Sequence, residues 1–260
     1  MEISRRQFSA LGAGAAVAVT LAGAPSASAA APNRKAPVRN VVLVHGAYAD
    51  GSSWSKVIPL LQAAGMSVTA VQNPLSSLAD DVATTEFALA RQDGPTILVA
   101  HSYGGTVISQ TGLAPNVAAL VYIAARAPEA GEDFAALSAK FPTPPVTAGI
   151  ISSGGFKFIG QQAFLEDFAN GVPRKEALTL FAAQGLLSTA PPTTSIAAWQ
   201  QKPSWYAVSK NDRTIDPDLE RFMAERMNAT TIEVDSGHLS LVTHPEVIAN
   251  LILEAAGSST

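Results

Sequence analysis

Apolar and polar residues follow two different spacings along residues 40–124. Short continuous apolar runs between turn residues predict buried strands, and apolar positions three and four residues apart predict amphipathic helices. The pattern predicts strands over 40–45, 66–71, 96–101 and 117–124, and helices over 54–64, 78–92 and 104–112. Alternating strands and helices are typical of a parallel sheet with helices on both faces, so we predict the α/β class.

The pattern is irregular between Arg126 and Gln201, where prolines and glycines interrupt it. Helical stretches are predicted near Gln161–Asn170 and Arg174–Gly185, so this segment has the character of a helical insertion. It also holds most of the phenylalanines of the chain, namely Phe134, Phe141, Phe156, Phe158, Phe164, Phe168 and Phe181. Each of them fits a small core within the insertion, and together they favour an apolar or aromatic pocket over a sugar or phosphate site.

The predicted strand 96–101 stops at Ser102, and two glycines follow at the start of the next helix. The local sequence Ala100-His-Ser-Tyr-Gly104 is close to the G-x-S-x-G pattern of a nucleophilic serine on a tight strand-to-helix turn, with alanine in place of the first glycine. A serine at this place could also be an ordinary helix N-cap. Ser102 is therefore the candidate nucleophile, with a capping role as the alternative.

Two later segments offer an acid and a base. Asp212 follows the predicted strand Ser204–Ser209, and a carboxylate at the carboxyl end of a strand can orient a histidine. Asp216 is the alternative acid, but it immediately precedes a proline, as N-cap residues often do. His238 follows the last predicted strand, whereas His244 precedes a proline at a helix start, which is typical of a capping role. The candidates are Asp212 as the acid and His238 as the base.

At these motifs the chain resembles the α/β-hydrolase superfamily, over nearly all of its length after the N-terminal segment. The matching stretches are VVLVHGAYADGSSW, TILVAHSYGGTVI, KNDRTIDP and DSGHLSLVTHPEVIANLI. The order Ser102, Asp212, His238 is the order found in that superfamily. The resemblance implies an α/β-hydrolase fold in which the backbone amides of Ala47 and Tyr103 form an oxyanion hole.

The compact chain and its His-Gly-Ala opening look most like the esterase and hydroxynitrile-lyase branch of the superfamily. Lyases of that branch carry a lysine directly after the catalytic histidine, and this chain has Leu239. The resemblance therefore implies a serine hydrolase that cleaves carboxylic esters or lactones of small apolar or aromatic substrates through an acyl-enzyme. The alternative is a non-hydrolytic enzyme of the same fold, such as a cofactor-free oxygenase or lyase, or a ligand-binding protein that uses the same pocket.

Composition restricts the partners and cofactors. The 260 residues, 47% of them hydrophobic, suffice for one domain with an inserted cap. The net charge of −4 and the absence of a basic cluster from the predicted fold argue against a nucleic-acid partner. The chain has no cysteine and only four histidines, without ligand-like spacing, so we predict no metal site and no cofactor. The expected partner is a small-molecule ester, and nothing in the sequence indicates an oligomeric state.

The N-terminal residues have the pattern of a twin-arginine export signal. The segment Ser4-Arg-Arg-Gln-Phe-Ser9 precedes a moderately apolar stretch and the small-residue cleavage site Ala27-Ser-Ala29. A retained membrane anchor is the alternative, but the stretch contains glycines and is shorter than the roughly 20 apolar residues that span a bilayer. We therefore predict a cleaved signal peptide over 1–29, one hydrolase domain over 30–260 with a cap at about 126–201, no stable membrane anchor, and a secreted or periplasmic protein.

Overall fold

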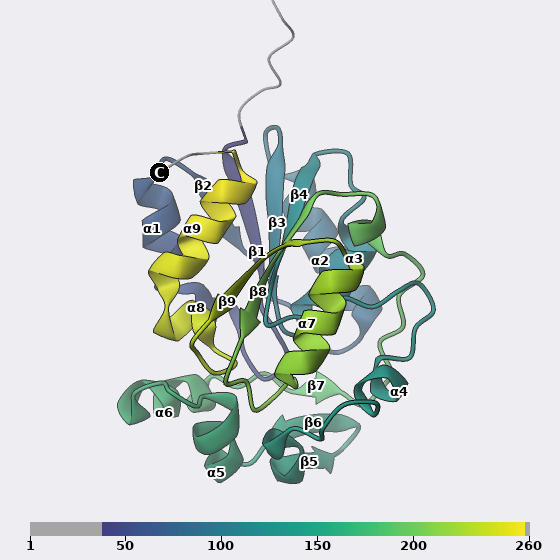
Figure 1. Cartoon of the computed structure of the whole chain (residues 1–260), viewed down its shortest axis with the longest axis vertical. Coiled ribbons are helices and arrows are strands. Elements are labelled where there is room, and N and C mark those ends of the chain that lie inside the picture. Colours follow the sequence, from purple (N-terminus) through teal and green to yellow (C-terminus); the bar gives the residue numbers. More distant parts are fainter. Residues whose placement is uncertain (1–37, 258–260) are drawn as a thin grey trace, which may run out of the picture. The chain divides into compact units, whose positions relative to one another are not determined.

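A six-stranded, wholly parallel sheet forms the centre of the computed structural model, which describes residues 38–257 (Figure 1). The strands are ordered β2-β1-β3-β4-β8-β9. Their bounds are β1 (Asn40–Val44), β2 (Ser67–Ala70), β3 (Thr96–His101), β4 (Val117–Ile123), β8 (Ser204–Ser209) and β9 (Thr230–Val234). The residues of β1 and β3 are all buried, as expected for central strands that are covered on both faces. This is the predicted α/β-hydrolase fold.

Helices cover both faces of the sheet. Figure 1 shows α1 and α9 side by side on one face and α2, α3 and α7 on the other. Their bounds are α1 (Val57–Ala63), α2 (Leu78–Ala90), α3 (Gly104–Thr111), α7 (Pro217–Arg226) and α9 (Pro245–Ala255), and the short α8 (Ser240–Thr243) precedes α9.

The first helix starts later than predicted. Residues 51–54 form a 3₁₀ turn, η1 (Gly51–Trp54), and α1 begins only at Val57. Pro59 lacks a backbone N–H, and only the first turn of a helix tolerates that loss. A helix starting at residue 54 would place Pro59 in its interior.

The segment between β4 and β8 is the cap, and it mixes helices with a small antiparallel sheet. Its helical elements are α4 (Phe134–Ser138), η2 (Pro145–Gly149), α5 (Gln161–Ala163), the π-helical turn η3 (Phe164–Phe168), α6 (Arg174–Ala182) and η4 (Ala198–Gln200). Its strands are β5 (Ile150–Ser153), β6 (Phe156–Ile159) and β7 (Leu187–Ser188). The sequence pattern did not predict this sheet. Gly154 and Gly155, with φ of 58° and 83°, form the tight turn between β5 and β6.

The two ends of the cap are hydrogen-bonded to each other, in a region that we call the neck. The Gly131 amide donates to the Thr194 carbonyl at 2.7 Å, and Trp199 Nε1 donates to the Pro128 carbonyl at 2.9 Å. The Thr194 hydroxyl also donates to the Glu129 carbonyl at 3.2 Å. The polypeptide between 131 and 194 therefore leaves the hydrolase core and returns to it at one place.

The predicted signal peptide, residues 1–29, lies outside the described residues. Within residues 38–257, no helix has both the length and the apolar character needed to cross a membrane.

Candidate active site

Ser102 occupies the sharp turn between β3 and α3. Its φ is +53°, a conformation that residues other than glycine rarely adopt. Its amide donates to the Ile123 carbonyl at 3.2 Å, and its carbonyl accepts from the amides of Gly105 and Arg126, both at 3.0 Å. These bonds hold the turn against the end of β4. The Ser102 hydroxyl is bonded to His238 and caps no helix, so the alternative N-cap role is not what the structure shows.

Glycines allow three segments to meet at this turn. A Cβ atom on Gly46 would lie 2.7 Å from the Ser102 Cβ, closer than non-bonded carbons approach. A Cβ atom on Gly104 would lie 2.8 Å from the carbonyl oxygens of Val44 and His45. Gly46 therefore lets the loop after β1 pack directly on the Ser102 turn, and Gly104 lets the start of α3 pack directly on the end of β1, because neither residue has a side chain.

The structure brings Ser102, His238 and Asp212 together in one buried chain of hydrogen bonds. The distance from Ser102 Oγ to His238 Nε2 is 2.9 Å, and that from His238 Nδ1 to Asp212 Oδ2 is 2.5 Å. Asp212 Oδ1 accepts from the amides of Thr214 at 2.6 Å and Ile215 at 3.0 Å. Because the three residues follow β3, β9 and β8, the parallel sheet gathers them at its carboxyl edge.

Asp216 has a different place. Its side chain accepts from the amide of Asp218 at 2.9 Å, and it is the N-cap of α7 ahead of Pro217. This is the capping role that the Asp-Pro sequence favours, and it leaves Asp212 as the carboxylate that contacts the histidine.

Two of the other three histidines bind backbone groups around the site. His101 Nε2 donates to the His238 carbonyl at 3.0 Å, and burial together with the nearby His238 holds the pKa of His101 well below its usual value. His45 Nδ1 donates to the Gly46 carbonyl and its Nε2 accepts from the Asn73 amide, while burial lowers the pKa of His45. His244 bonds to the Thr243 hydroxyl just before α9. No group of three potential metal-ligating side chains occurs in the described part of the chain.

The resemblance implied that the backbone amides of Ala47 and Tyr103 form an oxyanion hole. Ala47 belongs to the loop after β1 and Tyr103 directly follows the serine. Across residues 38–257, neither backbone amide donates to a protein acceptor. Both N–H groups are therefore free to bind an oxygen atom of a ligand held against Ser102.

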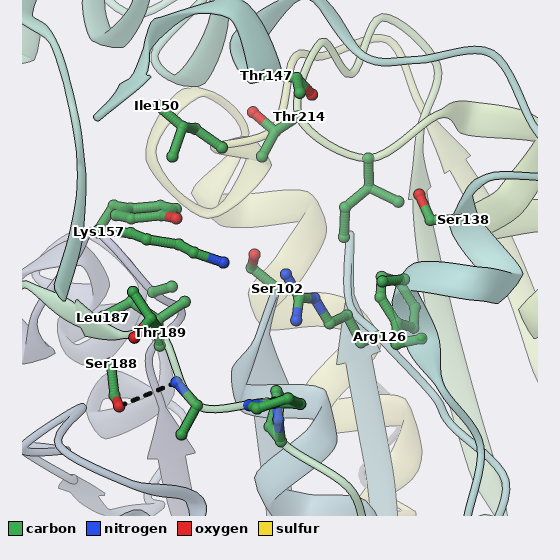
Figure 2. Close-up of a pocket in the computed structure, with 18 of the residues that line it drawn as sticks. Ser102, Arg126, Ser138, Thr147, Ile150, Lys157, Leu187, Ser188, Thr189 and Thr214 are labelled. Atoms are coloured by element: carbon green, nitrogen blue, oxygen red, sulfur yellow. Dashed lines mark hydrogen bonds between the residues drawn. The ribbon is translucent and has the colours of Figure 1, made fainter. Parts of the chain in front are cut away.

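A cavity of about 660 Å³ opens above Ser102, between the sheet edge and the cap (Figure 2). Its apolar walls include Val146, Ile150, Leu187 and Ile215. Of the seven phenylalanines singled out in the sequence, only Phe134 lines it. The phenylalanines therefore do not supply most of the pocket wall, and for the others the alternative of a small core within the insertion is the relevant one.

Three of these phenylalanines form an aromatic cluster within the cap. The ring centroid of Phe164 lies 4.8 Å from that of Phe168 and 5.4 Å from that of Phe181. The ring of Phe168 in turn lies 5.3 Å from that of His238 and 6.2 Å from that of Tyr48. This cluster covers the histidine and excludes water from it.

Glu220 is a buried acid near the site that the sequence analysis missed. It lies on α7, is fully buried, and its Oε2 accepts from the Ser209 amide at 3.1 Å. Burial and the adjacent Asp212 raise the pKa of Glu220 well above its usual value. Its Oε1 is buried and has no hydrogen-bond partner among residues 38–257. No local sequence signal could have identified it, because Glu220 occupies one position of an ordinary amphipathic helix.

Two cations on the cavity wall, Arg126 and Lys157, were also missed. Arg126 follows β4 at the carboxyl edge of the sheet, where ligands bind in such folds, so its position carried a usable signal. Lys157 lies between two phenylalanines on β6, and the sequence pattern there gave no indication of a pocket.

Comparisons with known proteins identify the family of the chain. The model of the alpha/beta hydrolase family matches residues 41–251. A carbendazim hydrolyzing esterase from Nocardioides sp. (strain SG-4G) is 34% identical over 131 residues, which are 45% of this chain and 53% of that protein. Methylesterase 2 from Arabidopsis thaliana is 25% identical over 255 residues, with 84% of this chain and 96% of that protein covered.

The fold is also that of solved hydrolases. The crystal structure of a pyrethroid hydrolase from Sphingobium faniae JZ-2 matches with a TM-score of 0.68 at 21% identity, covering 85% of this chain and 98% of that one. Because the family model spans β1 to α9 and the site lies where such folds carry their chemistry, the chain belongs to the alpha/beta hydrolase family.

Proposed function

We propose that this protein is a serine hydrolase that cleaves carboxylic esters or lactones through an acyl-enzyme. The observation that carries the proposal is the hydrogen-bonded series from Ser102 Oγ to His238 and on to Asp212, at the floor of a cavity. A serine hydroxyl becomes nucleophilic when a histidine can take its proton as it attacks a carbonyl carbon.

In the acylation step, Ser102 Oγ attacks the ester carbonyl while His238 Nε2 takes the hydroxyl proton. The amides of Ala47 and Tyr103 donate to the oxyanion of the tetrahedral intermediate. His238 then gives its proton to the leaving alcohol, and the acyl group stays on Ser102. A water molecule repeats the sequence, with His238 as base, and releases the acid.

Asp212 has the task of holding the histidine. Its Oδ1 is bound by two amides, so Oδ2 is fixed toward His238 Nδ1. This arrangement keeps the proton on Nδ1, leaves Nε2 free to act as base, and stabilises the imidazolium that forms.

The shape of the cavity and the relatives support an ester substrate. A volume of about 660 Å³ suits a small molecule, and the aliphatic wall suits an apolar acyl or alcohol part. Two of the proteins that the chain resembles are named a methylesterase and an esterase. Lyases of this branch, which cleave cyanohydrins, carry a lysine directly after the catalytic histidine. The residue at that position here, Leu239, is buried and apolar, so the chain lacks that cation.

The test is hydrolysis of short p-nitrophenyl esters by the wild type and Ser102→Ala. We expect the variant to lose about 10⁴-fold or more in kcat/KM while keeping its circular dichroism spectrum and melting temperature, because only the nucleophile is removed. Ser55→Ala, at an exposed serine outside the cavity, is the matched control and should keep wild-type activity.

A serine-directed organophosphate gives a second readout. Mass spectrometry should locate the label on the peptide that contains Ser102. Wild-type activity in Ser102→Ala, or a label on another serine, would refute the proposed role.

A further inference from the structure

Two cationic side chains face the cavity from opposite sides. Arg126 comes from the end of β4, and its amide donates to the Ser102 carbonyl at 3.0 Å, so its backbone adjoins the nucleophile. Lys157 comes from β6 in the cap. Figure 2 shows both side chains pointing into the pocket, with their charged ends turned toward Ser102.

Neither cation is neutralised by the protein. Among the described residues, no carboxylate forms an ion pair with Arg126 or Lys157. The Nε of Arg126 is completely buried and has no hydrogen-bond acceptor in residues 38–257. Burial lowers the pKa of Arg126, yet a guanidinium keeps its charge in proteins. An uncompensated charge is thus held beside the proposed reacting serine.

Acids near the cavity are already engaged elsewhere. Glu132 forms a two-point ion pair with Arg226, with distances of 2.8 Å and 2.7 Å. Asp133 lines the cavity, but it is exposed to solvent and its Oδ1 caps α4 by accepting from the amides of Ala135 and Ala136. The protein therefore has acids close by that it does not use to neutralise these two cations.

Aromatic rings fix the orientation of the guanidinium. The Cζ atom of Arg126 lies 4.6 Å from the ring centroid of Phe134 and 5.9 Å from that of Tyr103. Cation–π contacts of this kind offset part of the cost of burial and leave the N–H edge of the guanidinium available. That edge matches the two oxygens of a carboxylate.

We propose that this cavity binds a carboxylate of the substrate, so that the preferred substrate is an ester or lactone that also carries a free carboxylate. The guanidinium of Arg126 binds the carboxylate and the ammonium of Lys157 provides a second positive charge. The inference deepens the proposed function, on which its hydrolytic part rests. For a half-ester of a dicarboxylic acid, water cleaves the acyl–oxygen bond and yields one alcohol, one dicarboxylate and one proton.

The kinetic test compares esters that differ only in charge. Monoethyl adipate and ethyl hexanoate differ by a carboxylate in place of a methyl group on the acyl chain, and a pH-stat records the proton released from either. The salt of 6-(butyryloxy)hexanoic acid and hexyl butyrate make the same comparison in the alcohol part. The measured quantity is the ratio of kcat/KM for the anionic ester to that for its neutral partner.

We expect Arg126→Met to lower this ratio by about 10-fold to 100-fold in at least one of the two pairs, as the loss of a hydrogen-bonded charge predicts. Lys157→Met should lower it by a smaller factor in the same pair. Lys175→Met removes an equal charge from the exposed surface of α6 and should keep the wild-type ratio. An unchanged ratio in Arg126→Met for both pairs, or an equal loss on charged and neutral esters, would overturn the proposal.

Calorimetry separates binding from hydrolysis. Adipate should bind to Ser102→Ala, and the added Arg126→Met substitution should weaken that binding by about 10-fold or more. If adipate binds in this way but no ester is hydrolysed, the anion site stands and the proposed hydrolase activity fails. If esters are hydrolysed but adipate binding does not depend on Arg126, the hydrolase stands and the anion site fails. If Arg126→Met does not fold, Lys157→Met decides the question in both assays.

Discussion

The hydroxyl of Tyr103 donates a 2.7 Å hydrogen bond to Asp81 Oδ2 at the start of α2. Asp81 is completely buried, and its other carboxylate oxygen accepts from the Leu75 amide at 2.8 Å. The residue after Ser102, the proposed nucleophile, is thus anchored by its side chain to a neighbouring helix, while its amide is the proposed oxyanion donor. The anchor fixes the position of that amide without occupying the cavity.

Tyr103→Phe should lower the free energy of unfolding by about 1–3 kcal/mol, because a buried carboxylate loses a donor. The rate per folded molecule should fall by less than about 10-fold, since the amide stays in place. Urea unfolding at neutral pH measures the first effect. Tyr122→Phe is the matched control, because it removes a buried bond between two neutral hydroxyls, Tyr122 and Ser109, and should cost less. If Tyr122→Phe lowered the free energy of unfolding more than Tyr103→Phe does, the hydrogen bond from Tyr103 to Asp81 would not be the stabilising anchor described above.

Asp212→Asn should leave the chain folded and lower kcat by about 10⁴-fold. Asparagine can still accept from the amides of Thr214 and Ile215, but it presents an amide instead of a charge to His238 and favours the wrong tautomer. Asp216→Asn is the matched control, because asparagine is an equally good N-cap, and its turnover number should equal that of the wild type. If the two variants showed the reverse ranking, the orienting role would belong to Asp216.

Glu220→Gln should change how stability depends on pH. The pKa of Glu220 is raised in the folded state, so its stabilising contribution is complete below the pKa of the unfolded chain and is lost as pH rises through the folded pKa. Glutamine keeps the neutral form at every pH and can still accept from the Ser209 amide. The free energy of unfolding of the wild type should therefore fall relative to that of the variant as pH rises above about 4.3, the ordinary pKa of a glutamate.

Urea unfolding at a series of pH values checks this expectation. Glu225→Gln changes an exposed residue on the same helix, and its free energy of unfolding should vary with pH as that of the wild type does. Parallel curves for the wild type and Glu220→Gln would show that the buried carboxyl has no raised pKa.

The sequence pattern predicted those parts of the fold that local signals determine. The strands Thr96–His101 and Ser204–Ser209 have the predicted bounds, because a proline precedes each apolar run and a polar segment ends it. The β5–β6 hairpin was missed, although two adjacent glycines between short apolar runs are a hairpin signal. Its strands are too short to show a clear period.

The site was predictable where the fold alone determines it. Ser102, Asp212 and His238 each follow a strand, and a parallel sheet brings strand ends to one edge. Arg126 and Lys157 could not be paired from the sequence, because their approach depends on how the cap folds over the sheet. The burial of Glu220 likewise depends on long-range packing of α7 against β8.

The neck separates two parts of the polypeptide. Residues 131–194 could be exchanged for another segment, whereas the hydrolase core outside them would be retained. Because the polypeptide departs and returns at one hydrogen-bonded place, a different loop could be grafted between residues 131 and 194 without altering the strand pairing that supports Ser102. Lys157 lies within the exchangeable part and Arg126 outside it. Recombination at the neck would therefore keep Ser102, Arg126 and the sheet in place. Lys157, the upper wall of the cavity and the Phe168 ring that lies against His238 would change with the exchanged segment.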